Sequence, residues 1–521
     1  MNKTGSDAML DALSQMGVSV CFANPGTTEL DLVKAFENNG QMRCVLGLQE
    51  NVCTGAADGY GRMAAKPAAT LLHLGPGFAN GIANLHNAKR AHTPIINIIG
   101  DHMSWHLPYD APLSSDIESL AKPVSGWVYR IASVAEVKAV SYEAVKQTAN
   151  NGGQSATLIF PADYQAEQYD EAAAGQTVSE AVPSDAQSVS SFDLDAFLGK
   201  LKQAKSPLFL LGGGDENSAL SARGQIAVAR ICQVVNGRAF AETFPSRSER
   251  GQGLPDFDRL PYFPEPAHAV LDTADLVILA GALKPITYFG YVGFDSEMVD
   301  QARLHTLALP GEDAVSRLEQ IAESLNAPVW EPTAGLRPAE QEGALNPEKI
   351  AATVARILPE NAIVSVEGGT CGYPFYAASA AAARHTTLTN TGGAIGQGLP
   401  VAMGAAIACP DRTVLALLSD GSTQYTIQTL WTMAHEQLNV VVLIAANHQY
   451  AILRKELGRG DATIGKRSMA LTDLSTPRID WVGLANSYGL RASRAQTAEE
   501  LAAQLEQAVA TKGPTLIEMA I

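Results

Sequence analysis

TVLALLSDGS, residues 413–422, is a run of apolar residues that ends in a Ser-Asp-Gly-Ser turn. A second apolar run, NVVVLIAAN (residues 439–447), follows one helix-length later and ends at Asn447. Short apolar strands separated by helical segments are typical of a parallel α/β sheet. Because parallel strands bring their carboxyl ends to one edge of the sheet, the pattern predicts that Asp420 and Asn447 lie together at that edge.

Asp420 and Asn447 both offer oxygen atoms, which are the ligands that Mg²⁺ prefers. A magnesium ion at such an edge neutralises a diphosphate, while backbone N–H groups at a helix N-terminus bind the same anion. The alternative is that Asp-Gly is an ordinary turn and that Asn447 caps a strand. These two residues by themselves leave both interpretations open.

The same alternation of strands and helices extends over all 521 residues, a length too great for one hydrophobic core. Two polar stretches, residues 171–191 and 331–347, interrupt it like surface connectors. The sequence therefore predicts an α/β protein of three consecutive doubly wound parallel-sheet domains, residues 1–180, 181–340 and 341–521. The predicted strands lie within residues 17–26, 43–50, 68–77, 94–101 and 156–163, then 207–214, 237–243 and 275–282, and finally 362–369, 385–393, 413–422, 439–449 and 514–521.

Composition excludes several classes of protein. The formal net charge of −17 provides no basic surplus to neutralise a nucleic acid. The six cysteines are scattered without a CxxC pair, which argues against a disulfide framework or a zinc site and favours a reducing compartment. The first 17 residues predict an amphipathic helix rather than a signal peptide, and no segment is apolar for the roughly 18 residues of a membrane span. We therefore expect a cytoplasmic protein with neither nucleic-acid nor membrane partners.

Residues 419–449, SDGSTQYTIQTLWTMAHEQLNVVVLIAANHQ, resemble the cofactor signature of the thiamine-diphosphate enzyme family. The likeness is to the branch that contains acetolactate synthase and benzoylformate decarboxylase, whose signature begins with Gly-Asp-Gly and ends with Asn-Asn. Ser419 and Ala446 depart from it at positions that flank the metal. The resemblance implies that Mg²⁺ is held by Asp420, Asn447 and the backbone carbonyl of Gln449, and that Gly421, Ser422 and Tyr450 also contact the cofactor.

A second element, LGLQENVCTGAADGYGR (residues 46–62), places Glu50 between a strand and a helix. A carboxyl group buried at such a junction has a raised pKa unless it is paired, and it suits acid–base work in a dry site. The alternative is a glutamate that stabilises a helix N-terminus. The resemblance implies that Glu50 hydrogen-bonds the aminopyrimidine ring of thiamine diphosphate and controls its tautomer.

A third element places His73 between a strand and a Gly-Pro-Gly turn, which brings the backbone close to a ligand. Upstream, FANPGTTELDLV (residues 22–33) contains Thr27 just before a helical segment. The resemblance implies that His73 faces the substrate and transfers protons, and that Thr27 stands where a serine contacts the substrate carboxylate. The alternatives are a structural histidine and a threonine that caps a helix.

Two glycine-rich turns follow strands of the third domain, VEGGTCG (residues 366–372) and TNTGGAIGQGLP (residues 389–400). Such turns alone are weak signals. The resemblance implies that the first binds the diphosphate through Gly369, Thr370 and Cys371. In the second, it implies that the Gly393 carbonyl meets the aminopyrimidine and that Ile395 is the apolar wedge that bends the cofactor.

Three departures from the family bear on the reaction. The chain lacks the segment that accompanies flavin in acetolactate synthases, which makes FAD doubtful. PYDAPLSSD (residues 108–116) lacks the substrate-facing Phe and Gln of those synthases. The central-domain loop at residues 284–289 lacks the second catalytic histidine of benzoylformate decarboxylase; Tyr288 is the nearest substitute, and the loop's role is left open.

Two hypotheses follow for the function. In the first, the resemblance implies decarboxylation of a 2-oxo acid with thiamine diphosphate and Mg²⁺, ending in aldehyde release or in carboligation to a second carbonyl. It also implies a homodimer or homotetramer with active sites between subunits. In the second, the chain binds thiamine diphosphate or a nucleotide as a regulatory relative without catalysis; the departures at Ser419 and Ala446 leave room for it. Titration with thiamine diphosphate and Mg²⁺ distinguishes the two.

Overall fold

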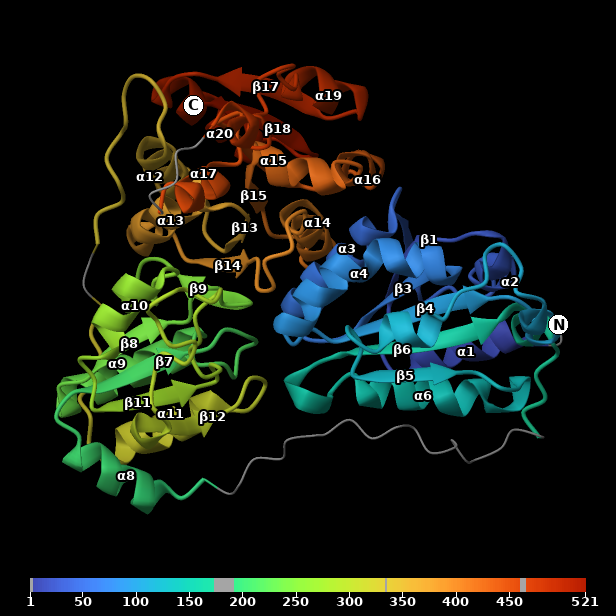
Figure 1. The fold of residues 1–521 in the computed structure, drawn as a ribbon, viewed down its shortest axis with the longest axis horizontal. Coiled ribbons are helices and arrows are strands. Elements are labelled where there is room, and N and C mark those ends of the chain that lie inside the picture. Colours follow the sequence, from blue (N-terminus) through green and yellow to red (C-terminus); the bar gives the residue numbers. More distant parts are fainter. Residues whose placement is uncertain (1–2, 173–191, 333–334, 460–464) are drawn as a thin grey trace.

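The chain forms three α/β units, each built around its own sheet, as the computed structural model in Figure 1 shows for residues 3–172, 192–332, 335–459 and 465–521. The predicted α/β class with parallel sheets is confirmed. No helix among these described residues combines the length and apolar character that a membrane span requires.

The first sheet has six parallel strands in the order β2-β1-β3-β4-β6-β5. Helices α1 and α6 cover one face and helices α3 and α4 the other, because each buries an apolar stripe against the strands. The sequence did not predict β5, a four-residue edge strand that alternates buried and half-buried residues instead of forming an apolar run. The elements are α1 (Gly5–Gln15), β1 (Val20–Asn24), α2 (Leu30–Ala35), β2 (Arg43–Leu46), α3 (Glu50–Ala64), β3 (Ala68–His73), α4 (Leu74–Arg90), β4 (Ile95–Asp101), α5 (Ile117–Ala121), β5 (Trp127–Arg130), α6 (Val137–Gln147), β6 (Ser155–Pro161) and α7 (Ala162–Ala166).

The second sheet has five parallel strands in the order β10-β8-β7-β11-β12. Its two central strands, β7 and β11, are almost completely buried, which explains why their apolar runs were visible in the sequence. The elements are α8 (Leu194–Gln203), β7 (Pro207–Leu211), α9 (Ala222–Val235), β8 (Arg238–Ala241), β10 (Asp258–Arg259), α10 (Pro264–Leu271), β11 (Leu276–Ala280), β12 (Leu304–Ala308) and α11 (Ala314–Ser324).

The third sheet has seven strands in the order β17-β18-β16-β15-β13-β14-β9. Six are parallel and come from the C-terminal third of the chain. The elements are α12 (Pro347–Ile357), β13 (Ala362–Val366), α13 (Gly369–Ala378), β14 (His385–Thr389), α14 (Gly398–Ala408), β15 (Val414–Ser419), α15 (Asp420–Thr423), α16 (Thr429–His435), β16 (Val440–Ala446), α17 (Ala451–Leu457), α18 (Lys466–Ala470), α19 (Trp481–Ser487), β17 (Arg491–Ala495), α20 (Ala498–Ala510) and β18 (Thr515–Ala520).

The seventh strand of this sheet, β9 (Arg247–Arg250), comes from the middle of the chain and pairs antiparallel with β14, as Figure 1 shows. Its sequence, RSER, has no apolar run, so periodicity did not reveal it. By pairing with β14 it covers an edge that would otherwise expose unpaired backbone groups. The middle and C-terminal parts of the chain are therefore joined by a shared sheet as well as by a connector.

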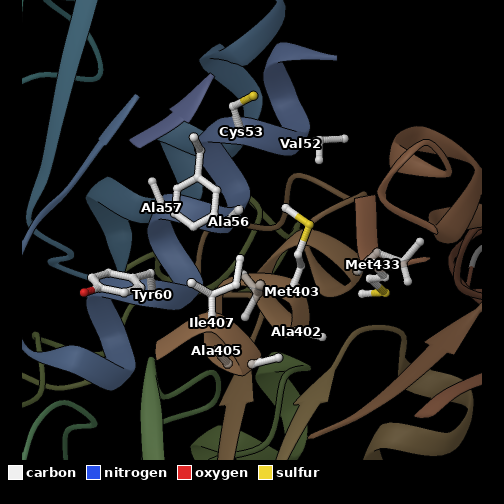
Figure 2. Packing of buried hydrophobic residues seen from close by; sticks show 14 of the residues in the cluster. Val52, Cys53, Ala56, Ala57, Tyr60, Ala402, Met403, Ala405, Ile407 and Met433 are labelled. Atoms are coloured by element: carbon white, nitrogen blue, oxygen red, sulfur yellow. The ribbon is translucent and has the colours of Figure 1, made fainter. Parts of the chain in front are cut away.

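The first and third units share one apolar core, in which α3 packs across α14 (Figure 2). The two helices approach closely because glycines lie at the crossing. A Cβ on Gly404 would lie 1.9 Å from the carbonyl oxygen of Ala56, and one on Gly59 would lie 2.1 Å from that of Val401. Larger residues at these two positions would force the helices apart.

The predicted boundary near residue 180 lies outside the described residues. Within the predicted middle domain, β9 pairs with the third sheet rather than with the middle one. The division into residues 1–180, 181–340 and 341–521 therefore stays a prediction.

Candidate active site

Asp420 follows β15 at the carboxyl edge of the third sheet and is 1% exposed. Its Oδ1 accepts a hydrogen bond from the Gly421 N–H at 2.8 Å, and its Oδ2 accepts one from the His448 N–H at 2.7 Å. Burial raises the pKa of Asp420, and these two donors oppose the rise. Among the described residues no lysine or arginine pairs with it, and the His448 ring nitrogen lies 3.9 Å away. A buried carboxylate in this position is suited to a bound cation.

Asn447 directly follows β16, next to His448, whose N–H bonds to Asp420; the two predicted residues therefore lie at the same edge of the sheet. Its amide nitrogen donates to the Thr370 hydroxyl at 3.2 Å, and its amide oxygen accepts from the Gln449 N–H at 3.1 Å. In the described part of the chain no donor bonds to the backbone carbonyl of Gln449. A carboxylate, an amide oxygen and a free carbonyl form the oxygen-only donor set that fits Mg²⁺.

The structure explains both departures from the family signature. A Cβ on Gly368, whose φ is +102°, would lie 2.1 Å from the Ser419 hydroxyl oxygen, so Ser419 occupies space that only a glycine leaves open. Ala446 is completely buried in the core shared by the first and third units. Neither departure removes one of the oxygen atoms predicted to hold Mg²⁺.

Helix α13 begins at Gly369, beside Asn447, and carries the predicted diphosphate loop. No side chain caps it, and no acceptor in the described residues bonds to the N–H groups of Gly369, Thr370 or Cys371. Such free N–H groups, with the positive end of the helix dipole, bind a phosphate. Burial raises the pKa of the Cys371 thiol to about 12, so Cys371 contributes its backbone rather than a thiolate.

The turn at Gly393 is held rigidly from both sides. Asn87 of α4 bonds to both backbone groups of Ala394, at 3.1 Å and 2.8 Å, and Asn390 accepts from the Gly393 N–H at 2.8 Å. In the described residues the Gly393 carbonyl has no donor. It is therefore free to bind a ligand, and the half-buried Ile395 lies two residues further along the chain.

Glu367 is a site residue that the sequence interpretation did not assign. It is 3% exposed, and its carboxylate accepts hydrogen bonds from the N–H groups of Gly396 and Gly398, both at 2.7 Å. Burial raises the pKa of Glu367, and these donors oppose the rise. The sequence offered one signal for Glu367, which is that it is the only charged residue in VEGGTCG.

Glu50 is the first residue of α3, and its Oε2 accepts a hydrogen bond from Asn80 at 3.0 Å. A Cβ on Gly77 would lie 3.1 Å from Glu50 Oε1 and 3.4 Å from His73 Cβ, so Glu50 and His73 flank the same glycine. Glu50 is half-buried in the single chain, less than the sequence interpretation assumed.

His73 ends β3 and pairs with the completely buried Glu29, with 2.8 Å between His73 Nδ1 and Glu29 Oε2. Thr28 donates to Glu29 at 2.6 Å and lies 3.2 Å from the same ring nitrogen. Thr27, the predicted substrate contact, is exposed at the start of a short 3₁₀ turn (Thr27–Glu29). The sequence interpretation therefore missed Glu29 and Thr28, which follow Thr27 directly in the motif.

A buried ion pair connects α3, which begins at Glu50, to the segment that contains the Gly393 turn. Arg62 of α3 binds Asp58 through two nitrogens, at 2.8 Å and 2.6 Å, and donates to the Thr389 carbonyl at 2.7 Å. Gln397 donates to Asp58 at 2.8 Å. Helix α3 therefore carries Glu50 at one end and fixes the Gly393 turn from the other. Within one chain, no described contact joins Glu50 to Asp420.

Comparison with known proteins agrees with this arrangement. The family model described as "Thiamine pyrophosphate enzyme, N-terminal TPP binding domain" matches residues 3–119, and its C-terminal counterpart matches residues 367–519. A Mycobacterium tuberculosis protein, named among the acetolactate synthase large subunits, is 44% identical over 521 residues and covers 99% of both chains. The benzoylformate decarboxylase of Pseudomonas aeruginosa is 28% identical, covering 99% of this chain and 98% of that one.

Among solved structures, a thiamine diphosphate-dependent 4-hydroxybenzoylformate decarboxylase from Rhodococcus jostii superimposes with a TM-score of 0.84. It is 25% identical and covers 99% of this chain and 98% of its own. The similarity in sequence and fold therefore extends over nearly the whole length of these relatives.

Proposed function

The chain belongs to the thiamine pyrophosphate enzyme family, and from that premise we propose that it uses thiamine diphosphate and Mg²⁺ to decarboxylate a 2-oxo acid. The observation that carries the proposal is the buried carboxylate of Asp420, which accepts a hydrogen bond from the His448 N–H within the turn of Asn447 and Gln449 and has no lysine or arginine partner among the described residues. A protein that only binds a nucleotide has no need for such a donor set together with Glu50.

We assign the cofactor's contacts from the free groups of the site. Asp420, Asn447 and the Gln449 carbonyl would hold Mg²⁺, while the N–H groups at the start of α13 would bind the diphosphate. The ring of Tyr450 packs against Gly421, and the Ser422 hydroxyl is bonded to the Ser419 carbonyl at 3.1 Å, so these residues shape the turn. When bound, thiamine diphosphate supplies the electron sink that accepts the charge released with CO₂.

We assign the opposite end of the cofactor to Glu50 and Gly393. The Glu50 carboxyl would exchange a proton with a nitrogen of the cofactor's ring, and the Gly393 carbonyl would accept a hydrogen bond from its exocyclic amine. Ile395 follows on the same turn and would supply the apolar surface against which the cofactor bends.

His73 is assigned to proton transfer at the substrate. Its pairing with Glu29 orients Nδ1, and Nε2 has no hydrogen-bond partner among the described residues. Because the His73 side chain is 23% exposed in the single chain, it is accessible to a ligand on the sheet edge. Thr27 remains a candidate for contact with the substrate carboxylate, since it is exposed beside this pair.

Aldehyde release is the outcome that we favour. In its imidazolium form, with Nδ1–H on Glu29, His73 would carry a second proton on Nε2 to give to the reacting carbon. Residues 108–116 also lack the substrate-facing Phe and Gln of acetolactate synthases. Carboligation to a second carbonyl is the second candidate, because the Mycobacterium tuberculosis relative at 44% identity is named for that reaction.

We propose that two copies, or two pairs of copies, form the active sites between subunits. No described contact brings Glu50 to Asp420 in one chain. Large apolar side chains are also exposed near both halves, among them Leu48 at 41%, Trp105 at 63% and Tyr425 at 55%. Surfaces of this kind mark protein interfaces. The six free cysteines support a reducing compartment, for which we propose the cytoplasm.

Incubation with thiamine diphosphate, Mg²⁺ and a panel of 2-oxo acids tests the activity. We expect CO₂ from at least one acid, and assays for aldehyde and hydroxyketone identify the outcome. Glu50→Gln keeps the bond from Asn80 but removes the carboxyl group that would exchange the proton, so turnover should fall below detection while the cofactor still binds. Glu37→Gln, at an exposed glutamate, is the matched control. Near-normal turnover by Glu50→Gln would refute the assigned role.

Mixing two inactive variants tests the shared site. When Glu50→Gln and Asp420→Ala subunits exchange at equal amounts, half of the dimers are mixed and each regains one intact site. About one quarter of the wild-type activity should therefore return, as a two-fold symmetric assembly requires. No recovery, despite proven exchange, would place both residues in the same site of one chain.

A further inference from the structure

In the middle unit, hydrogen bonds join the two arms of the loop between β11 and β12. The Thr287 N–H donates to the Ser296 carbonyl at 2.8 Å, and the Met298 N–H donates to that of Pro285 at 3.2 Å. Lys284 and Glu297 form an ion pair at 2.6 Å across its base. These bonds fix the backbone on both sides of Tyr288.

This loop contacts the Gly393 turn of the third unit at one end and helix α17 at the other. A Cβ on Gly393 would lie 2.2 Å from the Tyr288 hydroxyl oxygen, so the phenol lies directly on the Gly393 turn. At the other end, Tyr291 donates to Glu456 of α17 at 3.4 Å. Helix α17 begins at Ala451, just after the metal-binding turn.

Tyr288 belongs to a group of rings that we call the aromatic cover: Phe244, Tyr262, Tyr288 and Phe289. Around Tyr288 the ring centroids lie 5.7 Å away for Phe244, 4.9 Å for Tyr262 and 5.3 Å for Phe289. The pairs of Tyr288 with Phe244 and with Phe289 are edge-to-face, an arrangement that aromatic rings prefer. Tyr288 is nevertheless 39% exposed and Phe289 is 56% exposed, so the cover presents aromatic surface outward.

The hydroxyl of Tyr288 has no hydrogen-bond partner in the described part of the chain, whereas Tyr291 is bonded to Glu456. Burial raises the pKa of Tyr288, and the Arg90 charge opposes the rise, so the phenol keeps its proton at neutral pH. An unbonded donor next to the Gly393 turn is available to a bound anion.

We propose, on the basis of the function assigned above, that the aromatic cover is the wall of the substrate site and that Tyr288 donates its phenolic hydrogen bond to the carboxylate of the 2-oxo acid. Phe289 and Tyr288 pack against the substrate's side chain. The preferred substrates are therefore 2-oxo acids with an aryl or bulky apolar side chain, rather than the methyl group of pyruvate.

The test compares benzoylformate with pyruvate under saturating thiamine diphosphate and Mg²⁺. The wild type should show a kcat/KM for benzoylformate that exceeds that for pyruvate about 10-fold or more, as packing of an aromatic ring predicts. Tyr288→Phe should lower kcat/KM for both acids by about 10- to 100-fold, because both carry the carboxylate that loses a charged hydrogen bond. Phe289→Ala should lower only the value for benzoylformate.

Tyr142→Phe removes a phenol bonded to Gln15 on the far side of the first unit and should change neither value. The cofactor's affinity, measured by calorimetry, should be the same in Tyr288→Phe and wild type, which also shows that the variant is folded. Loss of that affinity would assign the phenol to the cofactor and overturn the inference. Unchanged kinetics in Tyr288→Phe, or a preference for pyruvate, would overturn it while leaving the decarboxylase function intact. If the wild type releases CO₂ from no acid, the proposed function and this inference fall together.

Discussion

Two glycine-rich turns of this protein follow strands of two different sheets, one after β7 and one after β13. They differ in whether the chain already bonds their N–H groups. Gly212–Gly214 follows β7 in a sheet whose order, β10-β8-β7-β11-β12, is that of nucleotide-binding folds. There the Gly213 N–H already donates to the Glu242 carboxylate at 2.6 Å, and the Gly214 N–H donates to the Arg247 carbonyl at 3.0 Å. The N–H groups at the start of α13 are bonded to no described acceptor.

A glycine-rich turn can bind an anion only where the chain leaves its N–H groups free, as it does at the start of α13. In the middle sheet the chain fills the turn with its own carboxylate and carbonyl. Arg247 is also the first residue of β9, so the segment that fills the turn is the one that joins the third sheet. The middle turn is therefore part of the attachment between units, whereas the N–H groups at the start of α13 are free for the proposed cofactor.

The largest effect is expected for a substitution in the proposed cofactor site of the third unit. Asp420→Ala removes the carboxylate that we propose binds Mg²⁺, and activity should fall by about 10³-fold or more, since a charged ligand would be lost from a buried site. Binding of thiamine diphosphate should no longer respond to Mg²⁺ in calorimetry. Glu242→Gln, at the filled turn, should leave that binding unchanged. An equal loss in both variants would contradict the distinction between the turns.

A smaller effect concerns pH and the filled turn. Burial raises the pKa of Glu242 to about 7, from an ordinary value of 4.5. The folded state therefore holds this proton more tightly than the unfolded state, and stability should decrease as the pH rises from about 4.5 to 7. Glu242 contributes at most about 3 kcal/mol to that decrease. Denaturant unfolding at several pH values measures it, and Glu242→Gln should have a flatter profile than wild type.

The next effect concerns Gly368, which precedes the free N–H groups at the start of α13. Gly368→Ala places a methyl group against Ser419 and requires an unfavourable φ of +102°, so it should destabilise the protein by about 1–3 kcal/mol. The double variant with Ser419→Gly should recover the part that is due to the clash and keep the part that is due to strain. Full recovery, or none, would show that only one of the two causes operates.

The smallest expected signal comes from ligands of the middle sheet. Because the Gly213 and Gly214 N–H groups are already bonded, FAD or ADP should give no heat of binding and no change in thermal unfolding at concentrations that saturate flavin enzymes. Saturable binding of either ligand would show that Glu242 and Arg247 move aside. That result would remove the contrast between the two turns.

The sequence predicted the parts of the site that lie at the ends of apolar runs. Asp420 and Asn447 follow the buried strands β15 and β16, and both lie at the predicted edge. Residues whose role depends on distant partners were not predictable in this way. Glu29 is recognisable only because the fold places it against His73, and Glu367 only because its carboxylate binds the turn at residues 396–398.

The sequence by itself determined the α/β class, the strands with continuous apolar runs, and the family motifs, because hydrophobic period and turn residues are local properties of the chain. Only the tertiary structure decided which turn is open, which strand completes which sheet and which hydroxyl lacks a partner. Those outcomes depend on hydrogen bonds between residues far apart in the chain. The pairing of Gly213 with Glu242 and of β9 with β14 leaves no periodic trace in the sequence.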